Sequence, residues 1–376
     1  MLTHGVAHDA AAVAEGVVQV APKLARLRVV AERAVTELGA APGAPTGAVR
    51  DALDAGRLIR SGDPARLDAL ERVLREGSID RSTAHVVGGG VNGTRSRYAI
   101  DAGAGSSALA VEKPVNAQAA QEQFAWKLGR ELGIDHLLAA VGWRPNGDAL
   151  IEFRPGISLA KAGVASVHDL DVAVATSYLA DTRLHLTPTE SAQAARIDRQ
   201  LLQFVDYLVA NNDRHLNNGL VDIADSGKVT FLDYGMMARG AVAHGGSELR
   251  PTMRSFQGSG PAPHVELDPD VIAYIRARLT PARIDALHRE VFEAQGIARP
   301  SPGTIGEKLY VGAKSPDFRT GMQHRLAQVL DHGGYDHAVS QGDEILDPAE
   351  QVDNRAVARG VGAVRNAFMD AAGGGW

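Results

Sequence analysis

The chain has 376 residues, a length that favours two or three domains. Its hydrophobic content of 45% and charged content of 22% are typical of a globular protein with a core, and the absence of cysteine excludes disulfides, cysteine-ligated zinc and thiol catalysis. The net charge of −6 gives no general attraction to nucleic acid, and no run of about 18 apolar residues predicts a membrane span. The N-terminus lacks a basic start followed by an apolar core, so we expect a cytoplasmic protein, with signal-independent secretion as the alternative.

An Ala-rich region opens the chain. Apolar residues recur at three- and four-residue steps from Val17 to Leu38, which predicts a helix, and the Pro- and Gly-containing segment 41–47 interrupts the pattern. A second helix is predicted from Asp63-Pro64 to Glu76, because Asp caps a helix and Pro suits its first turn. We assign residues 1–80 to an N-terminal helical extension, which fits either a regulatory cap or an export segment.

Three strands are predicted over residues 85–113. His85-Val86-Val87 leads into a glycine-rich turn, and Arg95–Ile100 and Ala108–Lys113 follow as the second and third strands. Glycines let backbone N–H groups approach phosphates closely. The candidate phosphate-binding residues are Gly88, Gly89, Gly90, Asn92, Gly93 and Thr94. The alternative is an ordinary hairpin, because a chain with 41 glycines contains such clusters by chance.

Lys113 ends an otherwise apolar strand. In a nucleotide site its ammonium reaches the α- and β-phosphates, and the alternative is a lysine that extends into water. A helix is predicted next over 117–132, with Gly133 as its C-cap. Glu122 and Glu131 flank its apolar stripe, and either could meet Lys113. We favour Glu122, since the third strand feeds into that end of the helix; a solvated glutamate is the alternative.

Two further strands are predicted over 138–143 and 149–153, followed by an Arg-Pro-Gly connector at 154–156. Five strands with one helix after the third make a small sheet lobe, which we place at residues 81–154. We expect an adenine to lie beneath such a lobe and to bind connector backbone near Glu152 and Phe153.

Residues 155–376 are predicted to form a mainly helical lobe. The expected helices cover 167–184, 191–210, 269–278, 281–295, 318–330 and 348–371. A hairpin interrupts them, with strands at 219–223 and 229–232 around a Gly-containing loop.

The helix before this hairpin leads into a polar loop that contains Asp213, His215 and Asn218, and the hairpin itself leads into Asp233. An acid, an amide five residues later and a second acid after a hairpin form a recurring phosphoryl-transfer arrangement. Asp213 is the candidate that aligns the acceptor or acts as general base, and His215 is a rival base. Asn218 and Asp233 are the candidate Mg²⁺ ligands. The alternative is a polar turn whose side chains cap helices.

At these residues the chain resembles the protein-kinase-like superfamily, and within it the atypical HipA-type bacterial kinases and the phosphatidylinositol 3-/4-kinases. The resemblance covers residues 85–265 and rests on Asp213-Arg214-His215 with Asn218, and on Asp233-Tyr234-Gly235. Ordinary eukaryotic protein kinases have the order His-Arg-Asp instead, and the glycine turn departs from G-x-G-x-x-G. The implied fold is α+β and two-lobed, with a small antiparallel sheet lobe and a larger helical lobe after the N-terminal extension.

The resemblance implies that the glycine turn covers the phosphates of ATP, that Glu122 orients Lys113 on them, and that Asn218 and Asp233 hold Mg²⁺. The expected activity is transfer of the γ-phosphoryl group to a hydroxyl of a protein Ser/Thr or of a small molecule or lipid. A lipid head group would favour a denser basic cluster than the chain offers, so the protein acceptor is slightly preferred. The alternatives are a pseudokinase-like binding module and AMP transfer to protein on the same fold.

Overall fold

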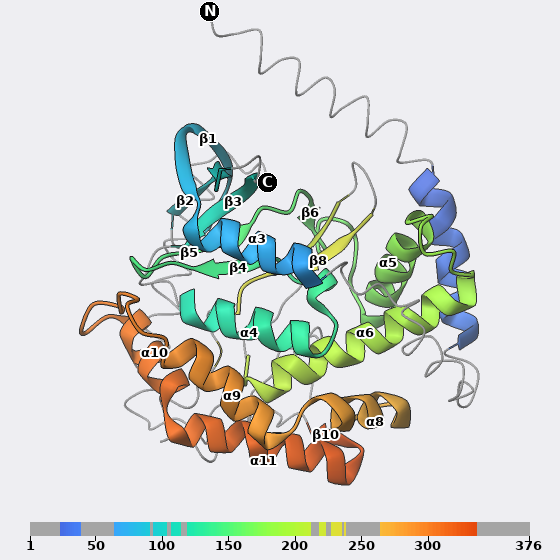
Figure 1. Cartoon of the computed structure of the whole chain (residues 1–376). Coiled ribbons are helices and arrows are strands. Elements are labelled where there is room, and N and C mark those ends of the chain that lie inside the picture. Colours follow the sequence, from blue (N-terminus) through green and yellow to red (C-terminus); the bar gives the residue numbers. More distant parts are fainter. Residues whose placement is uncertain are drawn as a thin grey trace, which may run out of the picture.

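The computed structural model describes residues 23–38, 64–90, 93–103, 107–113, 119–211, 218–222, 227–234, 237 and 264–336. The described chain combines α-helices with a small antiparallel sheet (Figure 1). None of its helices is both long and apolar enough to cross a membrane.

The main sheet has five antiparallel strands in the order β1-β2-β3-β5-β4. The strands are β1 (Ser78–Gly90), β2 (Gly93–Asp101), β3 (Ser107–Lys113), β4 (Val141–Trp143) and β5 (Ala149–Glu152). Helix α4 (Ala119–Glu131) connects β3 to β4. The predicted series of five strands with one helix after the third is therefore confirmed.

Helices cover both faces of this sheet at its β4 edge. Helix α3 (Pro64–Glu76) packs its fully buried Leu74 with Ile100 and Ala110 on one face. A Cβ at Gly142 would lie 2.6 Å from the backbone of Leu74 and Arg75, so β4 and α3 are in very close contact. Successive strand residues point to opposite faces, and the neighbours of Gly142 therefore face α4. Figure 1 shows α3 and α4 on either side of β4.

The predicted N-terminal extension contributes to two places in the fold. Helix α3 and the start of β1 belong structurally with the sheet, as described above. A helix over 23–38 buries Ala31, Ala34, Val35 and Leu38 in the core. It lies beside α5 (Val167–Ala180) and the β7–β8 hairpin, because a Cβ at Gly227 would be within 4.0 Å of both Leu24 and Ser177 (Figure 1).

Helices make up most of the rest of the described chain. Helix α6 (Pro188–Leu208) begins at a capping box in which Thr187 and Glu190 satisfy each other's backbone N–H groups. Thr187 is thus the N-terminal cap of α6 and Pro188 its first residue, so the helix begins three residues before the expected start at 191. The remaining helices are α8 (Pro269–Arg278), α9 (Pro281–Phe292), α10 (Ile305–Lys314) and α11 (Pro316–His332). Helix α10 was not predicted, and the predicted helix 348–371 lies outside the described residues.

The predicted hairpin is confirmed in a shorter form. Strands β7 (Gly219–Val221) and β8 (Val229–Phe231) pair with each other, and β6 (Ile157–Ser158) extends them to a three-stranded sheet. A two-stranded sheet joins β9 (His264–Glu266) to β10 (Gly334–Asp336).

A buried polar cluster joins the segment after α4 to the helices. His136, in the short 3-10 helix η1 (Asp135–Leu137), places Nε2 2.9 Å from the carboxylate of Asp198 on α6 and 3.0 Å from the hydroxyl of Tyr178 on α5. The Tyr178 hydroxyl also donates to Asp198. A parallel bridge between Leu138 and Phe231 adjoins this cluster and joins the β7–β8 hairpin to the segment between η1 and β4.

Candidate active site

Three charged side chains from separate parts of the chain converge at the end of β3. The Lys113 ammonium donates to Glu122 of α4, and its Nζ lies 3.0 Å from Oδ1 of Asp233, which follows β8. The second oxygen of Glu122 accepts the backbone N–H of Tyr234 at 3.1 Å. Lys113 and Glu122 are each 4% exposed, so both charges are removed from water and depend on each other.

The helix register explains why Glu122 is the partner of Lys113. Glu122 lies on the side of α4 that is buried against the sheet and the β7–β8 hairpin. Glu131, the alternative, lies at the far end of the helix and pairs instead with Arg283 of α9 at 2.6 Å. The preference for Glu122 is therefore confirmed, and the Glu131 alternative is wrong.

The electrostatics of the site keep Lys113 charged. Burial by itself favours the neutral amine, but the nearby carboxylates of Glu122 and Asp233 outweigh it and raise the pKa of Lys113. A lysine held as a cation in a water-poor site suits the binding of an anionic group.

Asp233 has an unusual backbone. Its φ of 63° lies in the left-handed region, which Asp adopts more readily than most non-glycine residues but at some conformational cost. The strained turn follows β8 directly and directs the carboxylate toward Lys113. Such strain recurs at functional sites, where the surrounding structure holds it.

The hairpin also places Asn218 next to Asp233. The Leu232 N–H donates to the Asn218 carbonyl at 2.8 Å, so the two candidate metal ligands leave the hairpin at the same end. Asn218 is 9% exposed. In the described residues no cluster of three or more His, Cys, Asp or Glu side chains forms a metal site. One amide and one carboxylate still fit Mg²⁺, which takes few protein ligands beside phosphate oxygens and water.

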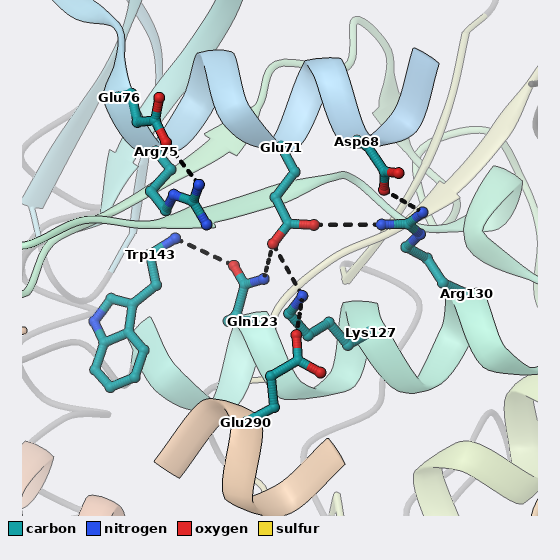
Figure 2. Close-up of polar contacts among 9 residues, drawn as sticks. All are labelled: Asp68, Glu71, Arg75, Glu76, Gln123, Lys127, Arg130, Trp143 and Glu290. Atoms are coloured by element: carbon teal, nitrogen blue, oxygen red, sulfur yellow. Dashed lines mark hydrogen bonds and ion pairs between the residues drawn. The ribbon is translucent and has the colours of Figure 1, made fainter. Parts of the chain in front are cut away.

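A cluster of ion pairs holds α4 in place, and Figure 2 shows it. Glu71 of α3 accepts from Gln123 at 3.0 Å, pairs with Lys127 at 3.0 Å and pairs with Arg130 at 3.3 Å. Lys127 also pairs with Glu290 of α9 at 2.8 Å, and Gln123 accepts the Trp143 N–H of β4 at 3.1 Å. We call Glu71, Gln123, Lys127, Arg130 and Glu290 the Glu71 cluster.

The Glu71 cluster ties α4 to three neighbours at once, namely α3, β4 and α9. Gln123 belongs to the cluster, and the next residue back, Glu122, holds Lys113. The cluster therefore fixes the helix that carries Glu122. These residues could not be recognised from the sequence, because charges on an amphipathic helix look like ordinary solvated residues until their partners are known.

A small cavity lies directly beside the charged residues. Its lining includes Glu122 and Asp233 and the apolar side chains Val141, Ile151 and Phe231. Its volume of about 10 Å³ is roughly the space that one water molecule needs. The cavity itself is thus too small for a nucleobase.

The predicted glycine turn forms the tip of the β1–β2 hairpin. Gly90 pairs with Gly93, Gly89 with Thr94, and Gly88 with Arg95, so the glycines belong to the strand pairs nearest the turn of the hairpin. Their contact with phosphate stays a prediction. Asn92 lies outside the described residues, as do Asp213 and His215 of the polar loop.

The backbone N–H groups at the predicted adenine connector are engaged in the sheet. Glu152 N–H donates to the Ala140 carbonyl and Phe153 N–H donates to the Leu109 carbonyl, each at 2.8 Å. The Glu152 side chain pairs with Arg154 at 2.8 Å. These two N–H groups are therefore not available to bind adenine. Adenine binding by the other backbone groups of the connector near Glu152 and Phe153 stays a prediction.

No family model matches the chain, and no curated protein matches it. A solved structure of a Helicobacter pylori proinflammatory kinase, CtkA, superposes on it with a TM-score of 0.39 and 10% sequence identity, over 68% of this chain and 98% of that one. At that score the similarity does not establish a shared fold.

Proposed function

We propose that the protein is an ATP-dependent phosphotransferase with a two-lobed, protein-kinase-like fold. The convergence of Lys113, Glu122 and Asp233 supports this most directly. A buried lysine held by a helix glutamate, beside an aspartate that follows a hairpin, is how kinase sites position nucleotide phosphates and their metal. In this proposal residues 81–154 form the small lobe and residues 155–376 the helical lobe.

The residues divide into three roles. Lys113 binds the α- and β-phosphates, and Glu122 fixes the direction of its ammonium. Asn218 and Asp233 hold Mg²⁺, which neutralises charge that develops on the phosphates. Asp213 aligns the acceptor hydroxyl, with His215 as the rival base. The backbone of the glycine turn covers the phosphates through Gly88, Gly89, Gly90, Asn92, Gly93 and Thr94.

The proposed acceptor is a hydroxyl of a protein Ser/Thr, and a small-molecule or lipid hydroxyl is the second choice. The proposed compartment is the cytoplasm of a bacterial cell. Two alternative functions use the same site: a binding module that holds nucleotide without turnover, and transfer of AMP to protein.

Incubation with Mg²⁺ and ATP labelled at the α- or the γ-phosphate separates these outcomes. The acceptors are the protein itself, dephosphorylated casein and phosphatidylinositol vesicles. We expect γ label on an acceptor, and loss of that label in the variant Asp233→Asn. Label transferred from the α-phosphate would replace the proposal with AMP transfer, and ATP binding without any transfer would replace it with a binding module.

A further inference from the structure

The register of the sheet shows which side chains share a face with Lys113. Lys113 lies opposite Ala149, and two residues earlier Val111 lies opposite Ile151, which in turn lies opposite Val141. Residues directly opposite on antiparallel strands point to the same face. We call this the cleft face, because Val141 and Ile151 line the cavity beside Glu122.

The cleft face continues beyond the part that α4 covers. Arg97 of β2 lies opposite Val111, so it also belongs to the cleft face. Leu109 and Phe153 lie on the same face, with the Phe153 N–H bonded to the Leu109 carbonyl. Leu109 is 40% exposed, whereas Lys113 is 4% exposed. The cleft face is therefore more exposed at Leu109 than at Lys113.

Arg97 extends toward Phe153 at this more exposed end of the cleft face. Its guanidinium carbon lies 5.4 Å from the centre of the Phe153 ring, which is the geometry of a cation–π contact. Among the described residues Arg97 has no hydrogen-bond acceptor and no carboxylate partner, and its side chain is half-buried. A guanidinium in this position offers a flat face and unused N–H donors to a ligand on the cleft face.

Arg81 provides an internal comparison. It also lies over an aromatic ring, at 5.4 Å from the centre of Tyr98, but Tyr98 neighbours Arg97 in the strand and so points to the opposite face. Unlike Arg97, Arg81 is paired through two hydrogen bonds with Glu112, at 3.0 and 2.9 Å. The two arginines therefore differ in the face that they occupy and in the availability of their donors.

We infer that Arg97 and Phe153 form the platform on which the purine base of the bound nucleotide stacks. This inference rests on the proposed function, in which Lys113 binds the phosphates. Leu109, beside Phe153, precedes Lys113 by four positions along β3, or roughly 13 Å at the rise of an extended strand. A base that stacks on this platform would lie at that distance from the phosphates, and the small cavity beside Glu122 has no room for a base.

The test measures the dissociation constants of adenosine, ADP and ATP by calorimetry for the full chain. The variants are Arg97→Ala, Arg97→Lys and the matched control Arg81→Ala. Loss of one stacking partner weakens base binding on the order of tenfold. Because the contact is to the base, we expect Arg97→Ala to weaken all three ligands by the same factor. Arg97→Lys keeps the charge without the flat guanidinium and weakens them similarly, while Arg81→Ala leaves them unchanged.

Three results would overturn the inference. Unchanged affinities in both Arg97 variants would remove Arg97 from the site, and a loss that grows from adenosine to ATP would make it a phosphate ligand instead. In both cases the wild-type protein still binds nucleotide, so the proposed function stands. A wild-type protein that binds none of the three ligands would overturn the proposed function together with the inference.

Discussion

Replacement of Lys113 by Met tests the buried charged residues by its effect on the free energy of unfolding, without an activity assay. The variant keeps the length of the side chain and removes the cation, which leaves the carboxylates of Glu122 and Asp233 facing each other. Because Glu122 is 4% exposed, water cannot replace the lost partner. Removal of one member of a buried pair costs about 3–5 kcal/mol of unfolding free energy.

Glu122→Gln is predicted to be milder than Lys113→Met. Lys113 then keeps Asp233 as its partner, and the Gln carbonyl can still accept the Tyr234 N–H that Glu122 binds at 3.1 Å. We expect a cost of about 1.5–3 kcal/mol, the range for a lost hydrogen bond to a charged group. The double variant should cost less than the sum of the two single ones, because the two residues interact directly.

Urea unfolding followed by circular dichroism measures these differences. Lys314→Met is the matched control, since Lys314 is an exposed lysine at the end of α10 and its loss should stay within about 0.5 kcal/mol. A Lys113→Met variant as mild as Lys314→Met would contradict the stabilising role of the buried Lys113–Glu122 pair. So would a Glu122→Gln variant that is the more destabilising of the two site variants.

Three further predictions concern the surroundings of the site. Gly142→Ala places a Cβ 2.6 Å from the backbone of α3 and should lower the unfolding free energy by about 1–3 kcal/mol; an unchanged thermal midpoint would contradict the contact between α3 and β4. Glu71→Gln removes the ion pairs that hold α4, so hydrogen exchange should become faster in α4 and stay unchanged in α11; equal rates in α4 would show that the Glu71 cluster does not hold it. Burial lowers the pKa of His288 below its ordinary value of 6.5, so as the pH falls below 6.5 the unfolded chain binds a proton before the folded one and stability declines. His288→Gln should show a shallower decline in unfolding free energy over that range, and an identical slope would contradict this assignment.

Local signals in the sequence were enough to predict most of the described elements near the site. The β7–β8 hairpin followed from a Gly-containing loop between β-branched runs, and the structure places Gly227 at a φ of 68° in that loop. The pairing of Lys113 with Glu122 followed from chain order alone, because β3 leads directly toward the first turn of α4. These features depend on residues close together in the chain.

Other features depend on contacts between distant segments, and for that reason the sequence could not show them. Glu71 looks like a solvated residue of an amphipathic helix until α4 and α9 are placed beside it. The left-handed backbone of Asp233 likewise has no sequence signature, since Asp is common in many conformations. Arg97 is on β2 and Phe153 follows β5, with β3, α4 and β4 between them in the chain, and only the register of the sheet brings them to one face.

The assignment of Asp233 as a metal ligand is tested by the effect of Mg²⁺ on ATP binding by the wild-type protein and by Asp233→Asn. Asp222→Asn is the matched control, because Asp222 is a carboxylate at the other end of the same hairpin, where its N–H bonds to the Lys228 carbonyl. We predict that Mg²⁺ tightens ATP binding in the wild-type protein and in Asp222→Asn, and that Asp233→Asn loses this dependence. Full Mg²⁺ dependence in Asp233→Asn would contradict the assignment of Asp233 as a metal ligand and, with it, the phosphotransferase site.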